Sequence, residues 1–215
     1  MANLFHFYTE MGLVELMGKK AKNLAELLDG IKNAPGPCIY HHTHKFLKQH
    51  HFLSPEPPND FAYWTGNVFG DEMLGEKLAA VDIIQFRSIR ELRDKFITTI
   101  EDHLREEFED RNVFSGYEFH FMKARSFVIK TGQVAGSLQE FLDVIKRIDT
   151  PSLYFHIFEA RIRLERDDND FSYWIASELG ENELARRIAK IDPYTITLEG
   201  LRKKIATLIE ERLYA

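Results

Sequence analysis

The amino-acid sequence predicts an α+β fold that is mainly α-helical and is built as an internal tandem duplication of one unit. The duplication is indicated by residues 5–42 and 119–156, which pair without a gap and share 15 identities in 38 pairs. Residues 59–82 and 169–192 then share 9 identities in 24 pairs. Helices are indicated because apolar residues recur every three or four positions behind capping residues in both copies. Internal similarity of this extent is typical of a repeated supersecondary unit.

We expect the first repeat unit to span residues 1–110 and the second to span residues 117–215. Between them, a charged run gives way to Asn112, Ser115 and Gly116, which are residue types typical of a linker. Duplicated units tend to bury equivalent faces against each other, so we expect the copies to pack with pseudo-twofold symmetry. The second unit is expected to be degenerate and mainly structural.

Each copy is expected to contribute a small β-hairpin at its start. In the second copy, residues 117–122 alternate between polar and apolar side chains, and residues 126–134 are rich in β-branched and aromatic side chains. The corresponding residues of the first copy, 4–20, have a weaker strand pattern. Their assignment as a hairpin therefore depends on the repeat.

Helices are expected to follow the hairpin in both copies. Asn23 and Glu26 have the spacing of a capping box, as Ser137 and Glu140 do. We expect prolines to begin the next helix, Asn-Asp pairs to cap a later one, and glycines to end it. These residues are Pro37 and Pro151, Asn59-Asp60 and Asn169-Asp170, and Gly70 and Gly180, with Ser88 and Thr197 at the start of the last helix.

Composition narrows the class of protein. The chain has 215 residues, 44% of them hydrophobic, which is enough for one moderate core or two small ones. Its formal net charge of −6 argues against nucleic-acid binding, which depends on clustered Lys and Arg. Cys38 is the single cysteine, so no intrachain disulfide is expected and nothing indicates an oxidising compartment. Because we find neither a signal-peptide pattern nor an apolar run of membrane-spanning length, we expect a cytoplasmic protein with no membrane partner.

A histidine-rich stretch at residues 39–64 distinguishes the first copy from the second. It holds five of the nine histidines, and two of them, His41 and His44, align with Phe155 and Phe158. Positions three apart lie on one face of an α-helix, and phenylalanines at both places indicate a buried face in the second copy. We therefore expect the first copy to have a polar cleft in place of that apolar contact.

The cleft is expected to be completed by an insertion of four residues and by the helix that follows it. The candidate ligand-binding residues are His41, His44, His50, His51, Glu56 and Asp60. Two further histidines of the first copy, His6 and His42, recur in the second as His120 and His156. We interpret these recurring histidines as part of the shared fold.

Three interpretations of the cleft remain open. In the first, His41, His44 and His50, completed by a carboxylate, hold a divalent transition metal such as zinc, iron, nickel or manganese. In the second, a histidine and a carboxylate bind or deprotonate a small polar ligand without a metal. In the third, the histidines form a structural hydrogen-bond network or a solvated face. The sequence has no HExxH, Walker, GxGxxG or GxSxG motif that would favour a known reaction.

The string HHTHKFLKQHHFLSPEPPNDFAYW, followed by GDEMLGEKLAAVD, resembles a prokaryotic family of unknown function, DUF5752. The resemblance extends over nearly the whole chain. Because the family has no established activity, the resemblance implies no catalytic residues. Its members accompany carbohydrate-related enzymes such as glycosyltransferases, which implies a link to glucan or sugar metabolism.

Together these observations favour an accessory protein of carbohydrate metabolism that binds a small polar ligand, a sugar or a metal in the cleft of the first repeat. A small hydrolase or lyase that uses histidine with a carboxylate is one alternative. An interaction scaffold without a small-molecule site is the other. Whether the chain is an enzyme stays open, and a homodimer is compatible with all three functions.

Overall fold

The structure is a computed structural model that describes residues 3–45, 58–83, 85–86, 88–107, 111–160, 168–191 and 196–214. The chain divides into two compact units. Unit 1 consists of Met1–Met11 and Ser126–Ala215, and unit 2 consists of Gly12–Arg125. The predicted division into 1–110 and 117–215 follows the sequence repeat. The compact units differ from it, because each combines the helices of one repeat with strand residues from both.

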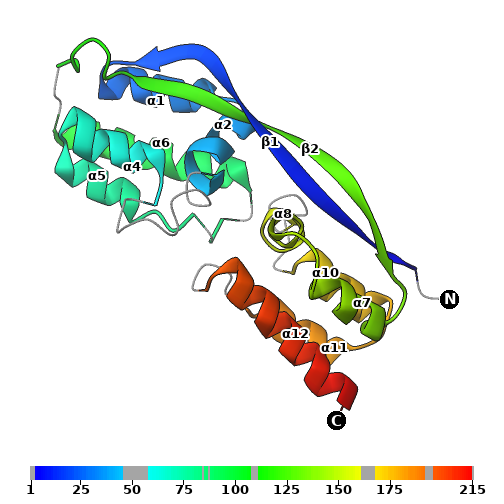
Figure 1. The fold of residues 1–215 in the computed structure, drawn as a ribbon. Coiled ribbons are helices and arrows are strands. Elements are labelled where there is room, and N and C mark those ends of the chain that lie inside the picture. The colour runs from blue at the N-terminus through cyan, green and yellow to red at the C-terminus, as the bar shows by residue number, and fades with distance from the viewer. Residues whose placement is uncertain are drawn as a thin grey trace. The chain divides into compact units, whose positions relative to one another are not determined.

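Most described residues are helical, and the described β structure is one antiparallel sheet of two strands (Figure 1). The strands are β1 (Phe5–Ala21) and β2 (Phe119–Ala135), which are 17 residues each. The prediction of a mainly helical α+β fold is confirmed. The prediction of a β-hairpin in each copy is wrong, because each copy contributes one long strand that pairs with the strand of the other copy.

The residues inside each strand explain why no hairpin forms. A short hairpin needs two adjacent residues that adopt a reversing turn, commonly Asn-Gly or Gly-Gly. Gly18 and Gly132 are isolated glycines with φ of 72° and 78°, a left-handed conformation that glycine adopts without strain. Both lie within a continuous strand, so each accommodates a local irregularity and does not reverse the chain.

The helical part of unit 2 comes from the first repeat. Its elements are α1 (Leu24–Asn33), α2 (Gly36–Tyr40), the π-helix η1 (His41–Lys45), α4 (Asp60–Tyr63), the π-helix η2 (Trp64–Phe69), α5 (Glu72–Ala79) and α6 (Ile89–Glu106). Asn23, Asn59 and Ser88 accept backbone N–H groups at the starts of α1, α4 and α6, as predicted. Gly70 ends η2 in a left-handed conformation with φ of 85°.

The helical part of unit 1 comes from the second repeat. Its elements are α7 (Leu138–Ile145), α8 (Thr150–Tyr154), the π-helix η3 (Phe155–Glu159), α10 (Asp170–Ser177), α11 (Asn182–Ala189) and α12 (Leu198–Tyr214). Ser137 and Asn169 cap α7 and α10 at the predicted positions. Among the helices that the structure describes, none has the length and hydropathy needed to cross a membrane.

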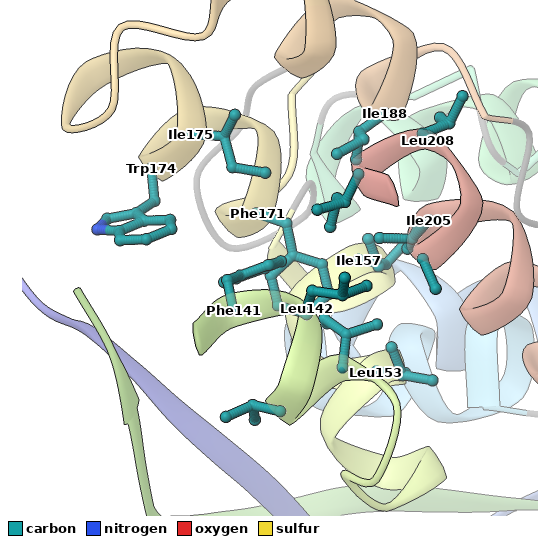
Figure 2. Close-up of a cluster of buried hydrophobic side chains, with 14 of the residues drawn as sticks. Phe141, Leu142, Leu153, Ile157, Phe171, Trp174, Ile175, Ile188, Ile205 and Leu208 are labelled. Atoms are coloured by element: carbon teal, nitrogen blue, oxygen red, sulfur yellow. The ribbon is translucent and has the colours of Figure 1, made fainter. Parts of the chain in front are cut away.

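Each unit has its own hydrophobic core, which a strand segment from the other repeat completes. Phe119 and Phe121 of β2 belong to the core of unit 2, and Phe5 and Phe7 of β1 belong to the core of unit 1. Figure 2 shows part of the unit 1 core, to which α7, α8, η3, α10, α11 and α12 contribute the labelled side chains. Phe7 and Phe121 are fully buried, and burying one such side chain is worth about 1.5–3 kcal/mol. The strand segments are therefore structural parts of both cores.

Candidate ligand-binding site

The histidine-rich stretch begins where an α-helix changes into a π-helix. α2 ends at Tyr40, and η1 continues it with four buried residues, His41, His42, Thr43 and His44. The second repeat makes the same change at Phe155, directly after α8. π-Helical turns are rare and occur frequently at functional sites. The helical periodicity of the sequence did not predict this change.

His42 and Asp60 form a hydrogen-bonded pair that fixes the histidine tautomer. The amide N–H of Met122 in β2 donates to Nε2 of His42 over 2.9 Å. Nδ1 of His42 lies 2.7 Å from Oδ2 of Asp60. Because Nε2 accepts a hydrogen bond, the proton of the neutral ring is on Nδ1, which donates to the carboxylate. Both nitrogens of His42 are therefore occupied.

The same pair recurs in unit 1. The amide N–H of Tyr8 in β1 donates to Nε2 of His156 over 2.9 Å, and Nδ1 of His156 lies 2.8 Å from Oδ2 of Asp170. In each unit the histidine thus connects a strand to the start of a helix. This geometry agrees with the interpretation of His42 and His156 as part of the shared fold.

The surroundings of the two His-Asp pairs differ at one position, where the first repeat has His41 and the second has Phe155. The His41 ring packs edge-on against His42, with 4.9 Å between ring centroids, and Phe155 packs against His156 at 5.0 Å. His41 is 6% exposed, and its Nδ1 atom has no hydrogen-bond partner among the described residues. Burial, assisted by the nearby His42, lowers the pKa of His41 to about 4, although Asp60 opposes this effect. The ring is therefore neutral at pH 7, with an unsatisfied nitrogen.

His44 has a different environment from His41. Its ring stacks on Tyr40 at 5.6 Å, as Phe158 stacks on Tyr154 at 4.6 Å in the second repeat. Nδ1 of His44 lies 3.0 Å from the hydroxyl of Thr43. Burial lowers the pKa of His44 to about 4, opposed by a hydrogen bond with the Ile83 backbone. His44 therefore acts as an aromatic core residue with hydrogen-bond partners.

The structure brings together only some of the predicted site residues. The potential ligand atoms of His41, His42 and Asp60 lie within 4.8 Å of one another, in a group that does not contain His44. A π-helix has a wider turn than an α-helix, so residues three apart diverge more around its axis. The other candidates, His50, His51 and Glu56, lie outside the described residues. His42 with Asp60 and His156 with Asp170 recur in the two repeats, and this recurrence is the signal in the sequence for the pair.

The donor set of this group tests the metal interpretation. A metal on Nδ1 of His42 would displace the proton that this nitrogen donates to Asp60. The displaced proton could not move to Nε2, because Nε2 accepts the Met122 N–H. Of the three residues, only His41 and Asp60 could bind a cation without disturbing β2. Two protein ligands are fewer than the three or four that zinc sites use.

Unit 1 has a hollow of about 540 Å³ that is lined in part by Phe155, the residue equivalent to His41. It is lined mainly by aromatic and aliphatic side chains, with His156 and Asp170 among them: Leu4, Phe5, His6, Tyr8, Val128, Phe155, His156, Asp170, Tyr173 and Trp174. Tyr173 is 48% exposed, and its counterpart in unit 2, Tyr63, is 40% exposed. In the first repeat, sequence equivalence puts His41 where Phe155 lines this hollow.

Comparisons with known proteins identify the family and one similar structure. A family model described as "Family of unknown function (DUF5752)" matches residues 2–210. The solved structure of OrfY from Thermoproteus tenax is similar to this chain, with a TM-score of 0.81 and 27% sequence identity. The match covers 99% of this chain and 97% of that one. No curated protein matches the chain.

Proposed function

The chain belongs to the family of unknown function DUF5752, and we propose that it binds a small polar ligand at the His41 face of the first repeat. The observation that carries this proposal is the buried Nδ1 atom of His41, which lacks a partner among the described residues. A buried polar atom without a hydrogen bond costs about 1–3 kcal/mol. A ligand hydroxyl that reaches this nitrogen would recover that cost.

The chemistry around His41 favours a neutral ligand that carries several hydroxyl groups. The Asp60 carboxylate is partly exposed, accepts hydrogen bonds and disfavours an anion nearby. The half-exposed ring of Tyr63 belongs to the same helix as Asp60 and offers an aromatic face. Sugars combine hydroxyl groups with apolar C–H faces, so a carbohydrate is the leading ligand class. The link to sugar metabolism that the family resemblance implies agrees with this class.

Binding is favoured over catalysis because of the basicity of His41. A general base works best when its pKa lies near the working pH. With a pKa of about 4, His41 is a hydrogen-bonding group and a weak base at pH 7. The hydrolase or lyase alternative therefore requires a base outside the group formed by His41, His42 and Asp60.

The metal alternative is supported by the proximity of the same three residues. It requires ligands in addition to His41 and Asp60, and the candidate His50 would be one of them. Metal content of protein purified without a histidine tag tests this alternative. A stoichiometric metal that is lost in His41→Phe would favour it over the carbohydrate proposal.

Carbohydrate binding is tested by calorimetry with glucose, maltose and maltotriose, using glycerol as a polyol that lacks a sugar ring. We expect saturable binding of at least one sugar and at least a tenfold loss of affinity in His41→Phe. This substitution introduces the residue that the second repeat already has, so we expect the variant to fold. Tyr173→Ala is the matched control, because it removes the exposed tyrosine of the other unit. Equal affinity in wild type and His41→Phe would contradict the proposal.

A further inference from the structure

We infer that each unit contains a binding site for an extended Phe-x-Phe segment and that a second copy of this chain can supply the segment by strand exchange. The segment in unit 1 is residues 3–8, which comprise the first residues of β1 and the two residues before it. The segment in unit 2 is residues 117–122. Each segment now occupies the site formed by helices of the other repeat.

Two phenylalanine rings anchor the segment in unit 1. Phe5 lies 5.5 Å from both Phe171 and Trp174, measured between ring centroids. Phe7 lies 5.4 Å from Phe141. The alternation of a strand directs both rings to the same face, and both are buried in the core of the second-repeat helices. A buried pair of aromatic anchors on one face is a feature of specific peptide recognition.

Hydrogen bonds hold the backbone on both sides of the two rings. Nε1 of Trp174 donates to the carbonyl oxygen of Asn3 over 2.8 Å, before the first anchor. The N–H of Tyr8 donates to Nε2 of His156 over 2.9 Å, after the second anchor. The site therefore provides one donor and one acceptor for main-chain groups of an extended segment, whatever its side chains at those positions.

The site in unit 2 binds its segment in the same way. Nε1 of Trp64 donates to the carbonyl oxygen of Tyr117 over 2.8 Å, and the N–H of Met122 donates to His42. The anchors are Phe119 and Phe121. Both segments have the sequence Phe-His-Phe, so both sites recognise the same central tripeptide.

Beyond the anchors, the strands leave the cores. Residues 11–16 and 125–130 are exposed without interruption. Several of the exposed side chains are large and apolar: Met11, Leu13, Val14, Leu16, Phe127, Val128 and Ile129. Exposed apolar residues in such numbers are typical of surfaces that another chain covers. A second copy is the partner that carries both the matching segment and the matching site, which is the requirement for domain swapping.

A peptide experiment tests the site in unit 1 within the full chain. Phe5→Ala combined with Phe7→Ala removes the anchors and leaves the helical residues of the site unsubstituted. A peptide with the sequence of residues 3–11 should bind this variant at least tenfold more tightly than wild type, whose site is filled. Binding of this peptide should also return the Trp174 fluorescence of the variant to that of wild type. A peptide with alanine at both anchor positions should not have this effect. Equal binding of the two peptides would overturn the inference.

Unit 1 of the double variant could be unfolded without its anchors. In that case, peptide addition should restore its circular dichroism. The single variant Phe5→Ala, which keeps one anchor, provides the second measurement. If the wild-type peptide neither refolds the double variant nor binds the single variant more tightly than wild type, the site does not recognise free segments and the inference is wrong.

Exchange between chains is tested by mixing two full-length variants. The Phe5→Ala/Phe7→Ala chain has an empty site, and a Trp174→Ala chain has a weakened site and an intact segment. We expect native mass spectrometry to detect dimers that contain one chain of each variant in the mixture. Each variant alone should form no dimers. Peptide binding without mixed dimers would show that the site accepts the segment but that a second copy does not deliver it, which overturns the exchange.

Discussion

Acid should destabilise unit 2 in part through His41, and His41→Phe should reduce this sensitivity. Burial lowers the pKa of His41 in the folded state from the ordinary value of 6.5 to about 4. Between these values the unfolded chain binds a proton that the folded chain does not bind, so stability falls as pH falls from about 6.5 to about 4. Above pH 6.5 both states are neutral at this residue, and below pH 4 the difference is constant.

The size of the effect follows from the difference in pKa. One pKa unit corresponds to about 1.4 kcal/mol, so the full difference is worth about 3 kcal/mol at pH 4 and about 2 kcal/mol at pH 5. His44 has the same lowered pKa of about 4 and adds a second contribution of the same sign. The sum is a large part of the stability of a small domain. Unit 2 should therefore unfold in acid before unit 1.

The assay can use the two tryptophans, because Trp64 lies in unit 2 and Trp174 lies in unit 1. In a Trp174→Phe background, urea unfolding followed by fluorescence reports on unit 2. We expect His41→Phe to be more stable than wild type at pH 7.5, because it removes the unpaired nitrogen. Its advantage should grow by about 2 kcal/mol at pH 5. The reciprocal control is Phe155→His in a Trp64→Phe background, which should make unit 1 acid-sensitive. If the difference between wild type and His41→Phe does not change with pH, the account of His41 as a buried neutral ring is wrong.

Two further predictions concern the fit of the strands. Gly30→Val should destabilise unit 2 by more than about 3 kcal/mol, because a Cβ atom at Gly30 would overlap the Phe121 ring; the second repeat has Val144 at this position. Urea unfolding should show that Phe121→Ala recovers part of this loss in the double variant, and additive losses would contradict the steric explanation. Asp60→Ala and Asp170→Ala should each cost about 1–3 kcal/mol, because each leaves a buried histidine N–H without its acceptor. Thermal unfolding of the single-tryptophan variants would measure both, and a loss in only one unit would contradict the equivalence of the two pairs.

Local signals in the sequence predicted the helices correctly. The side chains of Asn23, Asn59 and Ser137 accept N–H groups from residues three positions later, so the information lies within one turn of the chain. Strand pairing is not local in this sense. The partner of β1 is about 114 residues away, and the alternation of a strand does not identify its partner. A hairpin was predicted because it is the nearest pairing available, and it was wrong for that reason.

The candidate site was predicted in part, and the helix type explains the difference. The alignment of His41 and His44 with two phenylalanines predicted a buried face, and all four residues are buried. We expected both rings on one face because residues three apart share a face in an α-helix. His41 and His44 lie in the π-helix η1, whose turn is wider. Helical periodicity cannot distinguish the two helix types over five residues. The Met122 amide that fixes the tautomer of His42 comes from the other repeat, so no local pattern could have indicated it.

The interlocked strands have a consequence for how this protein can evolve. The side chain at position 7 must suit that at position 141, and the side chain at position 121 must suit position 30, although each pair joins opposite halves of the gene. Relatives should therefore show correlated changes between the halves at these pairs, stronger than those within either half. Separating the halves would remove Phe5 and Phe7 from one core and Phe119 and Phe121 from the other.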